Sequence, residues 1–248
     1  MAKEDRELKS RTKSKNIIGM MTVFLIALIC CATPAQAALI SVEPECQIVS
    51  KGEYFTVNIY ADPDGNETWA ASYNLYFNNT LLNATSQVNG TFLSQDGAST
   101  LVVTNEINNI AGRIEYGETR QSPATTGVTD PGVLATITFE ALTDGFCELG
   151  LGDWGGATTE LIDVNLTPIP TDVNNGSVRI GLCGDVNNDE SVDLGDVLDT
   201  FDHFMYSIPL PNEWAADVNK DDNIDLGDAL DIFDHFMYGK DLNCRCGA

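Results

Sequence analysis

Two stretches near the C-terminus decide the fold of that region: residues 185–206, DVNNDESVDLGDVLDTFDHFMY, and residues 217–238, DVNKDDNIDLGDALDIFDHFMY. The second copy begins 32 residues after the first, and 16 of the 22 paired positions are identical. An internal repeat of this kind fixes the architecture before any finer interpretation. Residues 181–248 are therefore predicted to form a small all-α module of two loop–helix units.

Each copy opens with a twelve-residue loop that carries oxygen-bearing side chains at positions 1, 3, 5, 9 and 12. Ca²⁺ takes about six to eight hard oxygen ligands, and position 7 of such a loop supplies a backbone carbonyl, so the spacing predicts one calcium ion per loop, two in all. The predicted ligands are Asp185, Asn187, Asp189, Ser191, Asp193 and Asp196 in the first copy and Asp217, Asn219, Asp221, Asn223, Asp225 and Asp228 in the second. Because clustered carboxylates repel one another, we expect the repeats to need the cation to fold. The alternative is an acidic, solvated helix pair that binds no metal.

The paired loops resemble the dockerin family, in which each loop is followed by a helix and preceded by none. Gly184 and the segment 209–211, Pro-Leu-Pro, argue against an entering helix. Asp at position 12, where ordinary EF-hand loops have Glu, also matches dockerins. Position 6 departs from the EF-hand pattern, because Glu190 and Asp222 replace the usual Gly. That departure predicts turn strain and a reduced calcium affinity.

The same resemblance implies which residues bind a partner. The positions by which dockerins recognise a cohesin correspond to Leu194, Gly195, Asp202, Tyr206, Leu226, Gly227, Asp234 and Tyr238. Because the two stripes are nearly identical, the resemblance implies two binding orientations related by about 180°. The alternative is that Asp202 and Tyr206 only cover a solvated face.

A second stripe on each helix is apolar, at about 100° per residue. It contains Leu194, Val197, Leu198, Phe201 and Met205 in the first copy and Leu226, Leu230, Phe233 and Met237 in the second. An apolar stripe on a short helix of a globular module is usually buried, so we predict that these residues form the core of the module.

The first 37 residues have the layout of a secretory signal peptide. Six basic residues precede a mostly apolar run at residues 17–32, and Ala35-Gln36-Ala37 is a small-x-small cleavage site. We therefore expect a secreted, extracellular protein, with association with the cell surface left open. A retained membrane anchor is the alternative, although the apolar run is short for a membrane span.

The composition limits the partners. The 248-residue chain has a net charge of −24, which argues against binding to nucleic acid and to anionic membranes. Six N-x-[ST] sequons predict a glycosylated surface, with unmodified polar turns as the alternative. They are Asn66, Asn78, Asn83, Asn89, Asn165 and Asn175.

Export also favours disulfide bonds among the five cysteines that follow the signal. These are Cys46, Cys147, Cys183, Cys244 and Cys246. Cys183 lies just before the first loop, and Cys244 and Cys246 lie just after the second helix, so we predict that Cys183 bridges one of those two. Cys46 with Cys147 is the predicted second bridge, and the odd count leaves one thiol over.

Residues 38–180 are predicted to form a β-sandwich of jelly-roll type with about nine strands. Apolar residues alternate with polar ones at residues 55–59, 73–77 and 133–141, and turn clusters such as Pro63-Asp64-Gly65-Asn66 separate the runs. The order of features resembles a cohesin domain, the partner family of dockerins. The matching segments are residues 54–61, 73–82, 132–139 and 175–180.

No catalytic motif is found in residues 38–180, which contain no His, no G-x-S-x-G and no H-E-x-x-H, so we do not expect an enzyme. The expected function is that of an adaptor in a cellulosome-like complex: the sandwich would bind dockerins and the module would bind a cohesin. The alternative is a carbohydrate-binding module on a dockerin that takes part in polysaccharide binding or degradation, with Trp69 and Trp154 as its aromatic candidates. A small glycoside-active enzyme and head-to-tail self-association also stay open.

Overall fold

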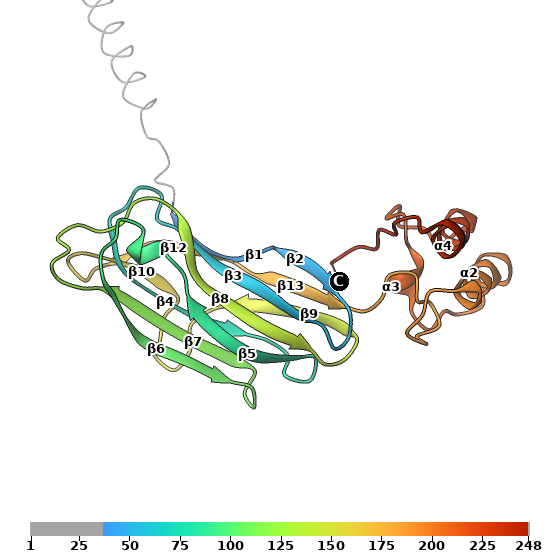
Figure 1. Cartoon of the computed structure of the whole chain (residues 1–248), viewed down its shortest axis with the longest axis horizontal. Coiled ribbons are helices and arrows are strands. Elements are labelled where there is room, and N and C mark those ends of the chain that lie inside the picture. The colour runs from blue at the N-terminus through green and yellow to red at the C-terminus, as the bar shows by residue number, and fades with distance from the viewer. Residues whose placement is uncertain (1–36, 248) are drawn as a thin grey trace, which may run out of the picture. The chain divides into compact units, whose positions relative to one another are not determined.

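The computed structural model describes residues 37–247 (Figure 1). The predicted signal segment therefore lies outside the described residues, except for Ala37. The described residues form one compact unit that contains thirteen strands, one short 3-10 helix and three α-helices. None of these helices is long and apolar enough to cross a membrane.

One layer of the sandwich is a five-stranded sheet with the order β12-β1-β3-β8-β5. Its strands are β1 (Ala38–Glu43), β3 (Tyr54–Asp62), β5 (Leu82–Asn89), β8 (Gly132–Ala141) and β12 (Thr171–Asn174). β3 pairs antiparallel with both β1 and β8, and β1 pairs parallel with β12. Residues near the two ends of the sandwich sequence therefore lie side by side.

The other layer is an eight-stranded sheet in which β4 pairs with β7 on one edge and with β9 and β10 on the other. Its strands are β2 (Cys46–Val49), β4 (Thr68–Tyr76), β6 (Thr100–Asn108), β7 (Arg113–Arg120), β9 (Gly145–Leu151), β10 (Glu160–Asp163), β11 (Pro168–Ile169) and β13 (Gly176–Ile180). Among the strands of residues 37–247, β6 pairs only with β7. The 3-10 helix η1 (Phe92–Ser94) lies between β5 and β6 in the sequence.

The predicted sandwich is confirmed, but it has thirteen strands instead of nine. The period-two pattern is clear in β3, where Phe55, Val57 and Ile59 are buried and pack in the core between the sheets. The added strands include β2, β10, β11 and β12, which are two to four residues long. Runs that short carry too few alternations to be recognised.

The C-terminal module contains α2 (Leu194–Tyr206), α3 (Glu213–Ala216) and α4 (Leu226–Tyr238). α2 and α4 are the two predicted repeat helices, and each begins with a capping box formed by loop positions 9 and 12. α3 was not predicted. It directly precedes the second loop, so an entering helix of four residues exists there after the segment 209–211, Pro-Leu-Pro, has ended.

The prediction that the apolar helix stripes form the module core is wrong for most of their residues, although Val197 packs against the core. Leu198 and Leu230 are 61% and 55% exposed, and Met205 and Met237 are also exposed. Most buried helix residues lie on the opposite side, namely Asp196 and Thr200 in α2 and Asp228 and Ile232 in α4. The buried Ala229 is the equivalent of the stripe residue Val197. The core consists of Val186, Ala216, Val218, Ile232 and Cys244. Loop and tail residues, together with Ala216 of α3 and Ile232 of α4, therefore supply most of the core that the stripes were expected to supply.

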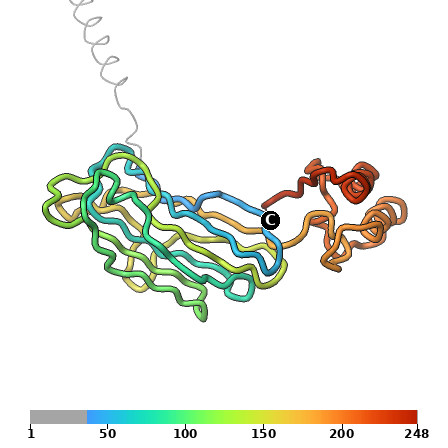
Figure 2. The backbone as a smooth tube through the Cα atoms, viewed as in Figure 1, coloured from blue at the N-terminus to red at the C-terminus, as the bar shows by residue number. Residues whose placement is uncertain are grey.

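Several contacts link the module to the sandwich within this unit. A disulfide joins Cys46 at the start of β2 to Cys246 in the C-terminal tail. The guanidinium of Arg179 in β13 lies 5.1 Å from the ring of Phe146 and 5.2 Å from the ring of Trp214. Figure 2 shows the tail after α4 returning toward the β2 end of the sandwich.

Candidate calcium loops and partner surfaces

The side chains at positions 1, 3 and 5 of the first loop turn toward the loop backbone. Asp185 Oδ1 and Asn187 Oδ1 both accept from the N–H of Asp189, at 3.0 and 2.9 Å. Asp185 Oδ2 accepts from the N–H of Glu190 at 3.0 Å, and Asp189 Oδ1 accepts from the N–H of Ser191 at 3.0 Å. Three predicted ligands therefore have oxygens on the inner side of one turn.

Position 12 closes the first loop onto its own start. Asp196 is fully buried, and its Oδ1 accepts from the N–H groups of Val186 and Asn187 at 2.7 and 3.2 Å. Its Oδ2 accepts from the N–H of Asp193 at 2.9 Å. Asp193 in turn accepts from the N–H of Gly195 at 2.6 Å and caps α2.

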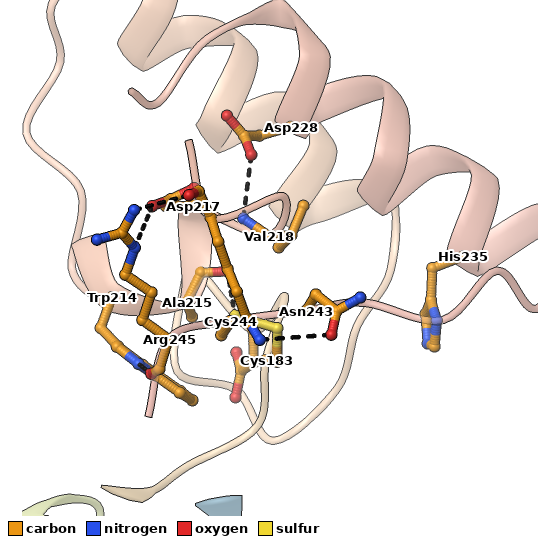
Figure 3. Close-up of a disulfide and its surroundings, with 12 residues drawn as sticks. Cys183, Trp214, Ala215, Asp217, Val218, Asp228, His235, Asn243, Cys244 and Arg245 are labelled. Carbon is orange, nitrogen blue, oxygen red and sulfur yellow. Dashed lines mark hydrogen bonds and ion pairs between the residues drawn. A yellow bond between two sulfur atoms is a disulfide. The ribbon is translucent and has the colours of Figure 1, made fainter. Parts of the chain in front are cut away.

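The second loop repeats this arrangement. Asp217 Oδ1 and Asn219 Oδ1 accept from the N–H of Asp221 at 3.2 and 2.9 Å. Asp228 Oδ1 accepts from the N–H of Val218 at 3.0 Å (Figure 3), and its Oδ2 accepts from the N–H of Asp225 at 3.0 Å. The two copies therefore share their hydrogen-bond pattern as well as their sequence.

Both loops contain two non-glycine residues in the left-handed region. Glu190 and Asp222 at position 6 have φ values of 68° and 67°, which confirms the strain predicted there. Asn188 and Lys220 at position 4 have φ values of 61° and 65°, and this second strained position was not predicted. Four strained residues per module mean that the surrounding bonds hold the loops in this shape.

The loops concentrate negative charge. Burial raises the pKa of Asp185, opposed by its bonds from the N–H groups of Glu190 and Asp189, and the charges of Asp196 and Asp189 raise it further. Burial likewise raises the pKa of Asp228, and the nearby charges of Asp217 and Asp221 add to the effect. A bound cation would offset this repulsion.

The donor set of each loop fits calcium in its chemistry. Carboxylates, an Asn side-chain carbonyl and a backbone carbonyl are the hard oxygen ligands that this ion prefers. Within residues 37–247, no group of three or more His, Cys, Asp or Glu side chains is gathered tightly enough to hold an ion by itself. The ligands would therefore include Asn and backbone oxygens, with the carboxylates turning from the loop N–H groups toward the ion.

The acids at position 6 each pair with a basic residue from outside the repeats. Lys51 Nζ lies 2.6 Å from Glu190 Oε1, so the first loop contacts the sandwich. Arg245 Nη1 lies 2.7 Å from Asp222 Oδ1, and Arg245 Nε lies 3.8 Å from Asp217 Oδ2 (Figure 3). The second loop therefore contacts the C-terminal tail.

The disulfides agree with one prediction and correct the other. Cys183 bonds Cys244, one of the two pairings predicted for it (Figure 3). The predicted Cys46–Cys147 bridge is wrong, because Cys46 bonds Cys246 across a separation of 200 residues. Cys147 is a free, buried thiol that accepts from the N–H of Asn78, and burial raises its pKa. Its position in β9 places it in the sandwich core, out of reach of the surface.

The residues that the dockerin resemblance implied for partner binding lie along α2 and α4. Leu194, Tyr206, Leu226 and Tyr238 are exposed, and Tyr238 is 77% exposed. The other four, Gly195, Asp202, Gly227 and Asp234, are half-buried or exposed. Together with the apolar stripes they make two acidic-rimmed apolar surfaces, which we call the α2 surface and the α4 surface.

The sandwich presents a different exposed surface at β6. Leu101 and Val103 are 50% and 68% exposed on a strand that pairs on one edge only. A shallow groove of about 290 Å³ lies beside them, with Ser72, Thr104 and Gly117 in its lining. Glu106 and Glu115 are cross-strand partners on β6 and β7, so this surface is also acidic. We call it the β6 surface.

The two tryptophans proposed as a glycan platform each lie under an arginine. The guanidinium of Arg113 is 3.5 Å from the centre of the exposed Trp154 ring, and that of Arg120 is 6.0 Å from Trp69. Trp69 is only half-exposed. Five sequon asparagines are exposed, and Asn83 is half-buried in β5.

No protein-family model matches the chain, and no curated protein matches it. Among solved structures it is similar to a cohesin from the archaeon Archaeoglobus fulgidus, with 16% identity and a TM-score of 0.45 over 59% of this chain and 93% of that one. It is also similar to a type I cohesin from Pseudobacteroides cellulosolvens, with 16% identity and a TM-score of 0.46 over 58% of this chain and 92% of that one. A chain of a type I cohesin–dockerin complex from Clostridium thermocellum has 14% identity and a TM-score of 0.48 over 60% of this chain and 97% of its own length. Each match covers about three fifths of this chain, and the fold class rests on the strand order described above.

Proposed function

We propose that this chain is a secreted, non-catalytic adaptor of a cellulosome-like extracellular complex. In this proposal the module binds two calcium ions and docks through the α2 or α4 surface on a cohesin-type domain of another protein. The sandwich receives a dockerin-type module on its β6 surface. The observation that carries the proposal is the exposure of the two apolar helix stripes.

Those stripes are costly to leave in water. Leu198, Phe201 and Met205 are all exposed on α2, and the matching Leu230 and Met237 are exposed on α4. Contiguous apolar residues on a soluble protein usually mark an interaction site. The loops fix the start of each helix through the capping boxes, so a calcium ion in a loop would stabilise the surface beside it.

The charges favour a partner with a basic rim. Residues 37–248 contain 34 acidic residues and seven lysines or arginines. All four basic residues of the sandwich are engaged by other groups: Lys51 by Glu190, Arg113 by Glu115, Arg120 by Asp96 and Arg179 by the carbonyl of Gly247. The β6 surface of a second copy would therefore meet the α2 surface acid against acid. Head-to-tail self-association is disfavoured for this reason.

The first test is a calcium titration of the full chain, followed by far-UV circular dichroism and thermal melting. Binding should raise the melting temperature of the module, and a chelator should reverse the rise. The proposal fails if millimolar calcium changes neither signal.

The second test measures binding to a panel of immobilised cohesin domains by surface plasmon resonance. Leu198→Ser combined with Leu230→Ser should weaken binding at least tenfold without changing the melting temperature. The matched control is Ile110→Ser with Leu166→Ser, which removes two exposed apolar side chains from sandwich loops. Either Leu198→Ser or Leu230→Ser alone should still bind the cohesin domains, because the surface on the other helix is intact.

Trp154 favours a second candidate function, binding of a polysaccharide. Its ring is exposed, as in a sugar-stacking platform, although Arg113 already covers one face. Gel retardation by soluble polysaccharides should then be lost in Trp154→Ala and kept in Trp69→Ala. No retardation of the wild type would remove this candidate.

A further inference from the structure

We propose that Arg245 is a tethered cation that opposes calcium at the second loop, so that the two loops bind calcium with unequal affinities. The inference rests on the proposed calcium binding. Arg245 belongs to neither repeat, and no position of the loop motif accounts for it. Arg245 is the residue that Asp222, the acid at position 6 of the second loop, contacts.

Arg245 contacts the second loop at three places. Its Nη1 lies 2.7 Å from Asp222 Oδ1 at position 6, and its Nε lies 3.8 Å from Asp217 Oδ2 at position 1. Its Nη2 donates to the carbonyl of Lys220 at position 4, at 2.7 Å. The guanidinium therefore lies against the predicted ligand Asp217 (Figure 3). It also lies against the position-6 acid Asp222, so it brings a positive charge to the loop.

The tail holds this guanidinium in place. The residue before it, Cys244, bonds Cys183, and the residue after it, Cys246, bonds Cys46. The backbone carbonyl of Arg245 accepts from Trp214 Nε1 at 2.5 Å. A long side chain fixed at both flanking residues loses less conformational entropy when it contacts the loop than the same side chain on a free tail.

The first loop lacks an equivalent contact. Its basic neighbour, Lys51, lies 2.6 Å from Glu190 at position 6, and the closer partners of Asp185 are the N–H groups of its own loop. The Lys51 and Arg245 side chains are similarly exposed, at 50% and 47%, so water screens the two charges alike. The loops differ in the partners of the position-1 ligand: Asp217 pairs with Arg245 at 3.8 Å, whereas the described residues contain no such ion pair for Asp185.

The sign and size of the effect follow from electrostatics. A calcium ion bound to Asp217 would lie roughly 6 Å from the guanidinium, given metal–oxygen distances of about 2.4 Å. At the dielectric constant of water, repulsion between a divalent and a monovalent charge at that separation weakens binding about tenfold, and screening by physiological salt reduces the factor to about threefold. The second loop should therefore be the weaker site by this factor.

The experiment measures both sites separately in the full chain. The backbone amides of Gly195 and Gly227 donate hydrogen bonds to the aspartate at position 9 of their own loops. The ¹H–¹⁵N NMR signal of Gly195 therefore reports calcium binding to the first loop, and that of Gly227 reports binding to the second. Calcium is titrated into the wild type and into Arg245→Gln. The dissociation constant from Gly227 should fall about three- to tenfold in the variant, and that from Gly195 should not change.

The matched control is Lys220→Gln, which removes one positive charge from the same loop at a residue whose ammonium contacts Asn243. It should change the Gly227 constant less than twofold. Arg245→Lys, which keeps the charge, should leave the Gly227 constant near its wild-type value. Cys46→Ser with Cys246→Ser frees one end of the tail, and the constant should then lie between those of the wild type and Arg245→Gln.

The possible outcomes separate this inference from the proposed function. If both loops of the wild type bind calcium and Arg245→Gln binds equally or more weakly at Gly227, Arg245 does not oppose the ion and the inference is overturned. If neither amide responds to millimolar calcium in the wild type, the proposed calcium function itself is overturned. Thermal melting of each variant shows whether it is folded. If Arg245→Gln is not folded, the calcium dissociation constant is measured at Gly227 in Arg245→Lys instead.

Discussion

The two repeats of the module have nearly the same sequence and the same backbone, but they have different neighbours. Left-handed residues occur at positions 4 and 6 of both loops, and both helices begin at a capping box. The first loop contacts Lys51 of the sandwich, whereas the second follows α3 and contacts Arg245 of the tail. Local sequence therefore fixes the loop–helix unit, and non-local contacts make the two units unequal.

The inequality extends to the core. Thr200 in α2 and Ile232 in α4 are equivalent positions, and both are fully buried. Ile232 adds an apolar side chain to the core, whereas the hydroxyl of Thr200 donates to the carbonyl of Asp196 within α2. The same interior position is thus apolar in the second repeat and polar in the first.

Breaking the link between the repeats should have the largest effect on stability. Cys183→Ser with Cys244→Ser opens a loop of 61 residues, and the chain-entropy model assigns such a bridge about 4 kcal/mol. Urea unfolding followed by circular dichroism should show the helices of the module unfolding at lower urea. Cys147→Ala is the control, because it removes a free thiol and should affect only the sandwich.

The aspartates at position 12 should be the next most sensitive residues, and unequally so. Asp196→Ala leaves three backbone N–H groups without their acceptor, whereas Asp228→Ala leaves two. With calcium present, we expect Asp196→Ala to lose about 1 kcal/mol more of the free energy of unfolding than Asp228→Ala, because it leaves one more N–H group unpaired. Equal losses in urea titrations of the two variants would contradict the inequality. Asp241→Ala, on the exposed tail, serves as the control.

The different side chains at this buried position make a smaller, directional prediction. Ile232→Ala should cost about 2 kcal/mol because it leaves a cavity, and Thr200→Ala should cost about 1 kcal/mol because it removes a small side chain and one hydrogen bond. Leu230→Ala, on the exposed α4 surface, should change stability by less than about 0.5 kcal/mol. A larger loss at Leu230 than at Ile232 would restore the buried stripe that the sequence predicted.

The sequence predicted what is local and repeated. The spacing of Asp, Asn and apolar residues predicted both loops and both long helices, and alternation predicted the long strands of the sandwich. It also found the apolar stripe of each helix correctly. It did not predict which side of the helix is covered, because the covering residues come from the loops and from Cys244 in the tail.

Long-range pairing was likewise beyond the sequence. The Cys46–Cys246 bridge spans 200 residues, and no local pattern distinguishes it from the predicted Cys46–Cys147 pairing. Arg245 carried one available signal, since it is a single basic residue between two cysteines in an acidic chain. Only the folded tail shows that this residue contacts the second loop.

Lowering the pH should have the smallest effect on stability. The pH range in which the sandwich stays stable is the range in which it can serve as a reference for the two repeats. Arg120 donates to Asp96 and, with the N–H of Ala98, lowers the pKa of that carboxyl to about 2. A folded pKa below the ordinary value means that the pair adds stability above about pH 4, and this stability is lost as the pH falls toward 2. Urea midpoints of the sandwich, followed by tryptophan fluorescence in a Trp214→Phe background so that only Trp69 and Trp154 report, should therefore stay level from pH 7 to 4 and fall below pH 4. Asp96→Asn should flatten that fall, because it removes the titrating carboxyl beside a guanidinium that is almost fully buried.

If the urea midpoints of the wild type and of Asp96→Asn fall in parallel below pH 4, other carboxyls cause the acid sensitivity. The sandwich would then not serve as a stable reference for the two loops.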